Sequence, residues 1–147
     1  APQIIDLANS LTKGKTSELE KSKAIYDFVA NTISYDVVKF QNDDFKWDDS
    51  ALKTLNSQTG VCQDYAYLTI ALLRSSNIEA RFVEGYTTDR HAWVEAKVDD
   101  RWVTMDPTWG AGYLNDNKEF IASFSEDYFD PDEEFFQKTH TRIGLVY

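Results

Sequence analysis

Cys62, His91 and Asp106 are residue types that together can transfer an acyl group. A thiolate can attack a carbonyl carbon, a histidine can hold the proton and return it to the leaving group, and a carboxylate can fix the imidazole tautomer. Cys62 is the only cysteine, and His91, one of two histidines, follows it by 29 residues. Asp106 follows 15 residues later. Each residue alone has a plainer interpretation, as a buried thiol, an edge histidine or a strand-end turn. The helices and strands around the three residues therefore determine whether they can form one site.

Cys62 stands where a buried helix is predicted to begin. Gly60 precedes an apolar stretch over residues 62–75, whose apolar side chains occupy most of the helical circumference. That pattern is typical of a central helix covered on several sides. Free amides and the helix dipole at such a start favour a thiolate, and the Cys62 N–H is one expected donor to an oxyanion.

A β-hairpin is predicted downstream of this helix. Residues 91–98 and 101–106 alternate between apolar and polar, and Asp99-Asp100 between them forms a two-residue loop. In the register that this loop sets, Val94 opposes Met105, so the apolar faces of the two strands match.

The same register places His91 and Asp106 on one face as diagonal neighbours. Such Cβ atoms lie roughly 7–8 Å apart or somewhat less, within reach of an imidazole and a carboxylate. A loop of odd length would put the two side chains on opposite faces. The spacing therefore predicts an imidazole–carboxylate contact.

The other predicted elements place the helices before the strands. Residues 17–32 form a helix that opens with a Ser17–Glu20 capping box. The pattern also predicts a loop followed by a short helix over 49–56. It predicts a strand over 80–86 and a last strand within 143–147. The order indicates an α+β fold with a mostly antiparallel sheet.

Five further residues are weighed for the site. A second oxyanion donor is expected upstream of Cys62, with Trp47 and Gln58 as candidates. Trp93 and Trp109 flank the site in sequence and are candidates for an aromatic substrate cleft. His140 is expected to be structural.

Composition excludes several classes of protein. The 147 residues carry a net charge of −10, which disfavours binding to nucleic acid or to an anionic membrane surface. A single cysteine excludes an intrachain disulfide and Cys-rich zinc sites. The acidic residues of 126–134 lack EF-hand spacing and fit a solvated loop, so no metal or cofactor is expected.

Three sequence blocks resemble the transglutaminase-like superfamily, whose core is similar to that of papain-like cysteine proteases. They are 60–66 (GVCQDYA), 91–95 (HAWVE) and 105–109 (MDPTW). With the lead-in 23–36, the resemblance covers about residues 17–109. It implies Cys62 as nucleophile, His91 as general base and acid, and Asp106 as orienting carboxylate. The chain departs from animal transglutaminases in having Val61 before the cysteine, and in lacking a counterpart of their calcium sites.

These observations predict one papain-like, transglutaminase-core domain over 1–147, with its core at 17–109 and an extension at 110–147. The start at Ala1 suggests a fragment or processed form of a longer chain, and a secreted or bacterial cell-envelope setting is favoured. The expected activity is cysteine-dependent acyl transfer through a thioester, by a thiol peptidase, an amidase or a protein-glutamine transamidase. Its partners would be a protein or peptide substrate and, for transamidation, an amine acceptor. The alternative is a catalytically silent binding or scaffold module with the same fold.

Overall fold

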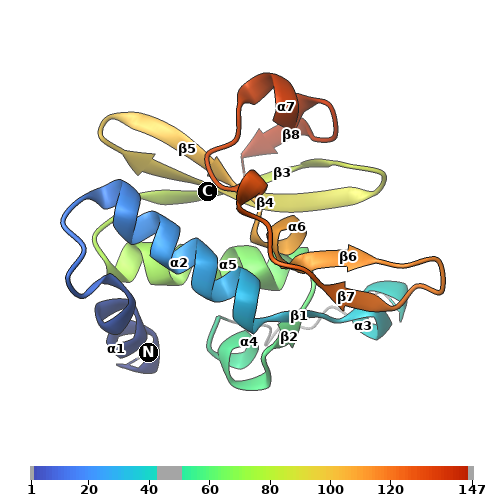
Figure 1. Ribbon diagram of the computed structural model, residues 1–147, viewed down its shortest axis with the longest axis horizontal. Coiled ribbons are helices and arrows are strands. Elements are labelled where there is room, and N and C mark those ends of the chain that lie inside the picture. Colours follow the sequence, from blue (N-terminus) through green and yellow to red (C-terminus); the bar gives the residue numbers. More distant parts are fainter. Residues whose placement is uncertain (1, 43–50, 146–147) are drawn as a thin grey trace.

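Helices dominate the first half of the chain and strands the second (Figure 1). The computed structural model describes residues 2–42 and 51–145. The helices are α1 Pro2–Thr12, α2 Glu18–Thr32, α3 Val37–Asn42, α4 Ala51–Ser57, α5 Cys62–Ser75, α6 Pro107–Ala111 and α7 Glu133–Gln137, with a 3₁₀ turn η1 at Glu126–Tyr128. The strands are β1 Ser34–Tyr35, β2 Thr59–Gly60, β3 Ala80–Tyr86, β4 Arg90–Val98, β5 Arg101–Met105, β6 Gly112–Leu114, β7 Phe120–Ala122 and β8 Thr141–Leu145.

The main sheet is antiparallel, with strand order β5–β4–β3–β8. Val94 opposes Met105 and Val98 opposes Arg101, so the predicted hairpin register is confirmed. Asp99 and Asp100 have φ angles of 50° and 66°, and two successive positive φ values are what a two-residue type I′ turn requires.

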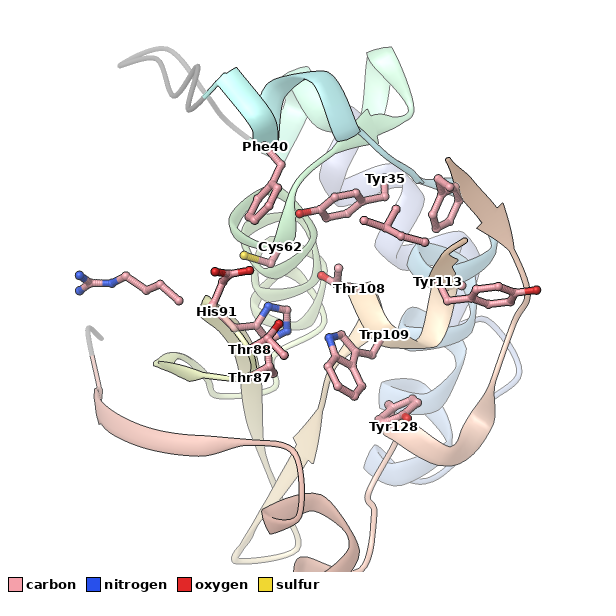
Figure 2. A pocket seen from close by; sticks show the side chains of 15 residues that line it. Tyr35, Phe40, Cys62, Thr87, Thr88, His91, Thr108, Trp109, Tyr113 and Tyr128 are labelled. Atoms are coloured by element: carbon pink, nitrogen blue, oxygen red, sulfur yellow. The ribbon is translucent and has the colours of Figure 1, made fainter. Parts of the chain in front are cut away.

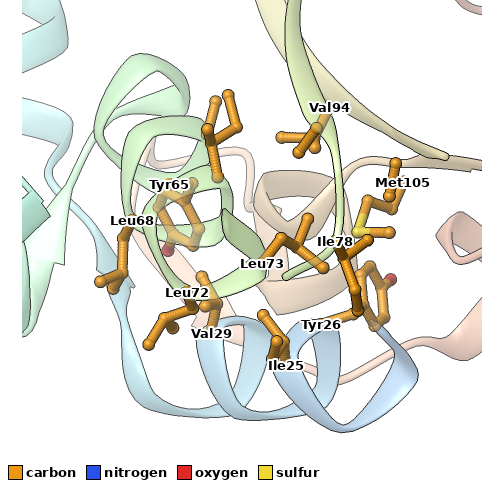
Figure 3. Close-up of a cluster of buried hydrophobic side chains, with 14 of the residues drawn as sticks. Ile25, Tyr26, Val29, Tyr65, Leu68, Leu72, Leu73, Ile78, Val94 and Met105 are labelled. Atoms are coloured by element: carbon orange, nitrogen blue, oxygen red, sulfur yellow. The ribbon is translucent and has the colours of Figure 1, made fainter. Parts of the chain in front are cut away.

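Helix α5 is the centre of the hydrophobic core (Figure 3). It packs on α1, α2 and α4, and on strands β3 and β4 of the sheet. Tyr65, Leu68, Leu72 and Leu73 are fully buried on it, which agrees with the apolar circumference seen in the sequence. The helix that begins at Cys62 is therefore held on several sides, and so is the position of its first residue.

Helix α7 of the C-terminal segment covers the other face of the sheet, and the segment then adds β8 to the edge of the sheet beside β3 (Figure 1). Val83, Trp93 and Phe136 form a second, smaller buried cluster there. Beside it, the buried carboxylate of Glu95 forms ion pairs with Arg81 and with Arg142 of β8. This segment thus brings residues distant in sequence next to β4.

A two-residue parallel pair, β1 with β2, leads the chain into α5. Ser34 opposes Thr59 and Tyr35 opposes Gly60. The Asp36 N–H donates to the Gly60 carbonyl over 2.8 Å. This small ladder sets Tyr35 beside the residues that precede the nucleophile candidate.

The predicted helices and strands recur with small differences. Ser17 caps α2 by accepting from the Glu20 N–H over 3.1 Å, as the capping box predicts. The short helix expected at 49–56 is α4, and the last strand is β8. Helices α1, α3, α6 and α7 and the pairs β1–β2 and β6–β7 were not predicted, and α3 lies within residues 36–50, where a loop was expected. Among the described residues, no helix combines the length and the apolarity that a bilayer span needs.

Candidate active site

Cys62 is the first residue of α5 and is half-buried. The turn before it is fixed by Asp64, whose Oδ2 accepts from the Val61 N–H over 2.9 Å and lies 3.0 Å from Lys39 Nζ of α3. A Cβ on Gly60 would lie 2.6 Å from the Cβ of Asp64, so only glycine fits there without a shift. Glycine and aspartate together therefore place the thiol at the start of the helix.

His91 and Asp106 meet as the hairpin register predicts. The His91 Nε2 lies 2.8 Å from Asp106 Oδ2, and both side chains are buried. Since Nε2 is engaged by the carboxylate, Nδ1 is the ring nitrogen left to face Cys62, which lines the same cavity (Figure 2). The three side chains thus follow one another in the order thiol, imidazole, carboxylate.

Asp106 is fully buried and is bonded through both carboxylate oxygens. Its Oδ1 accepts from the Trp109 N–H over 3.2 Å, which caps the short helix α6. Its backbone N–H donates to the Tyr128 carbonyl over 2.9 Å. Pro107 at the first helical position needs no donor partner, so the strand can end and the helix can begin directly after the carboxylate.

His140 joins this site from the C-terminal segment. Its Nε2 lies 2.7 Å from Asp106 Oδ2, the oxygen that also binds His91. Its Nδ1 lies 2.8 Å from the Thr139 hydroxyl, and its ring stacks on Phe136 with centroids 3.8 Å apart. Because the carboxylate can only accept, the His140 Nε2–H donates to Asp106, and the Thr139 hydroxyl that faces Nδ1 also lies 3.4 Å from the Phe136 carbonyl. Sequence spacing gave no signal for this contact, because 34 residues separate His140 from Asp106.

The electrostatics of the pair favour its charged form. Burial disfavours the imidazolium, but the charge and hydrogen bond of Asp106, with a smaller contribution from Cys62, raise the pKa of His91 to about 10. Burial alone would raise the pKa of Asp106. The charge of His91 and the hydrogen bonds from His140 and His91 instead hold that pKa well below its ordinary range. The imidazolium–carboxylate pair is therefore expected throughout the neutral range.

A cavity of about 470 Å³ opens over Cys62 and His91 (Figure 2). Its wall is largely aromatic and includes Tyr35, Trp109 and Tyr128. A second cavity, of about 420 Å³, also reaches Cys62 and His91 and is lined further by Gln63, Phe82 and Glu84. Both cavities are thus lined by Cys62 and His91, which lie where the two adjoin.

Of the other candidate site residues, only some lie in the cavity over Cys62. Trp109 lines the larger cavity, as the cleft interpretation expects. Trp93 does not line it and is 2% exposed, so its placement as a cleft residue is corrected: it shares a sheet face with His91 but is covered by Phe136 and His140. Gln58 is exposed and lines neither cavity. Trp47 lies outside the described residues.

His91, Asp106 and His140 also form a group that a metal ion could use. Their ligand atoms lie within 4.8 Å of one another, in the part of the chain that the structure describes. Both Nε2 atoms are already hydrogen-bonded to the carboxylate, so an ion would have to replace those hydrogen bonds. The group fits a hydrogen-bonded triad without any ion.

The sequence model of the transglutaminase-like superfamily matches residues 5–107, which include the helix that begins at Cys62 and the whole hairpin. The chain belongs to the transglutaminase-like superfamily. It is 28% identical over 152 residues to the kyphoscoliosis peptidase of Mus musculus, covering 92% of this chain and 22% of that protein. The chain thus spans less than a quarter of that relative's length.

Solved structures agree with this family and fold. A candidate cysteine protease from Cytophaga hutchinsonii matches with a TM-score of 0.62 and 31% identity, over 73% of this chain and 37% of that one. The periplasmic domain of TgpA from Pseudomonas aeruginosa matches with a TM-score of 0.53 and 24% identity, over 74% of this chain and 42% of that one. The predicted transglutaminase-like, papain-like fold is confirmed.

Proposed function

We propose that this protein is a cysteine-dependent acyl-transfer enzyme that acts on a carboxamide or peptide carbonyl. One observation carries the proposal: His91, bonded to the buried Asp106 at 2.8 Å, lines the same cavity as Cys62 at a helix start. That arrangement supplies a nucleophile, a proton carrier and an orienting carboxylate in hydrogen-bonding order.

The reaction begins with attack of the Cys62 thiolate on the carbonyl carbon. The carbonyl π electrons move to oxygen, and the Cys62 N–H stabilises this oxyanion. When the intermediate collapses, the carbon–nitrogen bond breaks, and His91 gives its proton to the departing amine. A thioester on Cys62 remains. Water or an amine then attacks the thioester carbon and gives a proton to the neutral His91, and the carbon–sulfur bond breaks. This step releases an acid or a new amide and restores the Cys62 thiolate and the His91 imidazolium.

We favour hydrolysis over transamidation, because the sequence indicates no acceptor-binding site. The name of the kyphoscoliosis peptidase and the description of the Cytophaga hutchinsonii protein support the same preference. The substrate is proposed to be a protein or peptide, since the two cavities that share Cys62 and His91 can take the chain on either side of a scissile bond.

The rate of Cys62 alkylation by iodoacetamide, measured from pH 5 to 10, tests the proposal. An assembled pair gives a reactive plateau well below pH 8 in the wild type, which His91→Ala removes. Cys62→Ala supplies the unlabelled blank. A rate that follows an ordinary thiol and is unchanged by His91→Ala would instead favour the silent binding or scaffold module.

Labelled casein then separates the two activities of the proposed enzyme. Hydrolysis releases labelled peptides, and transamidation incorporates a fluorescent primary amine into the casein. Both signals must vanish in Cys62→Ala. Full activity of that variant would overturn the assignment of Cys62 as nucleophile.

A further inference from the structure

The hydroxyl of Tyr35 lies beside Cys62 without a hydrogen bond in the described part of the chain. Tyr35 ends β1 and lines the larger cavity together with Cys62 and His91. The buried tyrosines Tyr26 and Tyr65 use their hydroxyls structurally, donating to carbonyl oxygens at 2.7 and 2.8 Å. Tyr35 has no such partner, so its O–H remains free to bind a group in the cavity.

The ring of Tyr35 is held firmly enough to aim this hydroxyl. It packs between Phe40 and Phe120, with ring centroids 6.0 and 6.4 Å away. Its backbone pairs with Gly60, two residues before Cys62. The phenol and the Cys62 N–H are therefore fixed relative to each other by a short stretch of ladder.

The hydroxyl retains its proton at neutral pH. Burial raises the pKa of Tyr35 above its usual range, and the negative charge of Cys62 raises it further. This charge effect also indicates that the phenol and the sulfur are near each other. Figure 2 draws the Tyr35 hydroxyl on the side of Cys62, with Tyr35 and His91 on opposite sides of the thiol.

We infer that the Tyr35 hydroxyl is the second hydrogen-bond donor to the oxyanion, acting with the Cys62 N–H. The inference rests on the proposed acyl-transfer function. His91 must face the leaving group, so the carbonyl oxygen points away from the imidazole, towards the side on which Tyr35 lies. When sulfur attacks and the carbonyl π electrons move to oxygen, the O–H donates to that oxygen without losing its proton. The donor is released when the carbonyl reforms and the leaving group departs.

Thr108 also carries a hydroxyl on the cavity wall and is weighed against Tyr35 for this role. The Thr108 Oγ1 is buried and has no hydrogen-bond partner among the described residues. It belongs to α6, which begins after Asp106, and its oxygen is almost fully covered by neighbouring atoms, so a substrate carbonyl would reach it only after a local shift. We therefore assign the oxyanion to Tyr35, and the experiment tests both hydroxyls.

The test uses p-nitrophenyl acetate as acyl donor and iodoacetamide as alkylating agent. Acylation by the ester forms an oxyanion and releases a burst of nitrophenolate, whereas alkylation is a displacement at carbon that forms none. Tyr35→Phe is expected to slow acylation by about 10²–10³-fold, the usual loss for one oxyanion donor, and to change alkylation by less than about 3-fold. Tyr86→Phe, which removes a hydroxyl from a 45% exposed tyrosine that lines neither cavity, should change neither rate.

Other results would overturn the inference. Unchanged acylation in Tyr35→Phe, or the loss in Thr108→Val instead, would remove Tyr35 from the oxyanion site. An equal fall of acylation and alkylation in Tyr35→Phe would show that the phenol acts on the thiol itself. Absence of both the burst and the low-pH alkylation plateau in the wild type would contradict the proposed function as well.

Discussion

His140 donates a hydrogen bond to Asp106 over 2.7 Å, on the same carboxylate oxygen that holds His91. The carboxylate therefore has two imidazole neighbours, of which only His91 lines the cavity over Cys62. In the proposed enzyme His140 is a positioning residue, because it would act on Cys62 and His91 only through Asp106.

Replacing His140 with phenylalanine should destabilise the fold by about 1–3 kcal/mol at pH 7, since a buried carboxylate loses a donor. The hydrogen bond lowers the pKa of Asp106, so the stability that it contributes is present above the ordinary pKa of 3.8 and is lost as pH falls. Urea unfolding from pH 3 to 8 measures the difference, which should shrink below about pH 4.

His140→Gln is the matched comparison, because its amide can still donate to the carboxylate. It should recover part of the stability and of the alkylation plateau. Equal stability of the wild type and His140→Phe at pH 7 would show that the hydrogen bond contributes nothing.

Asp106→Asn should abolish the alkaline dependence of stability. The pKa of His91 is about 10 in the folded protein against an ordinary 6.5, so the stabilisation is full below pH 6.5 and is lost as pH rises towards 10. Asparagine removes the charge responsible, so the melting temperature of this variant should vary less between pH 6.5 and 10. Its alkylation rate at pH 6 should fall at least about tenfold, since the imidazolium is no longer held next to the thiol.

The control for this variant is Asp130→Asn, which removes a carboxylate paired with the half-exposed Arg101 at 2.7 Å. A surface pair of this kind contributes about 0–1 kcal/mol, so the pH profile should keep its shape. A wild-type slope that persists in Asp106→Asn would contradict the electrostatic account of His91.

Gly60→Ala should disturb the nucleophile helix. The new Cβ would lie 2.6 Å from the Cβ of Asp64, and both atoms are fixed directly to backbone. The start of α5 must then shift, which should cost about 1–3 kcal/mol and slow Cys62 alkylation. Gly144→Ala places a methyl group where nothing lies within 4 Å and serves as control. Equal alkylation rates in the two variants would show that Gly60 does not set the position of the thiol.

Ser22→Ala should be neutral or stabilising. Ser22 lies in α2, is fully buried, and its hydroxyl has no hydrogen-bond partner among the described residues. Alanine removes an unpaired polar atom and has the higher helix propensity. Urea denaturation should give a free energy of unfolding equal to or above that of the wild type, and a loss of more than about 1 kcal/mol would contradict this view of the site.

The sequence pattern predicts the structure correctly where residues close together in the chain determine it. The two-residue turn at Asp99 and Asp100 determines the hairpin register, and that register brings His91 to Asp106. The apolar circumference of residues 62–75 likewise predicted α5 with its observed bounds.

Contacts between segments distant in the sequence could not be predicted from local residue patterns. The pairing of Tyr35 with Gly60 needs only two residues per strand, too few to show a period. His140 reaches Asp106 because the C-terminal segment crosses the sheet, which no local spacing encodes. Trp93 was assigned to the cleft for its nearness in sequence to His91, and that same segment covers it.

The crossing of the C-terminal segment also sets the order in which the site is completed during synthesis. The ribosome makes Cys62 first, and His140 is added 78 residues later. Until that histidine docks on Asp106, a nascent chain carries a thiol without its full set of polar neighbours. In the proposed enzyme, the thiol would therefore gain its full polar surroundings only after most of the chain has been made.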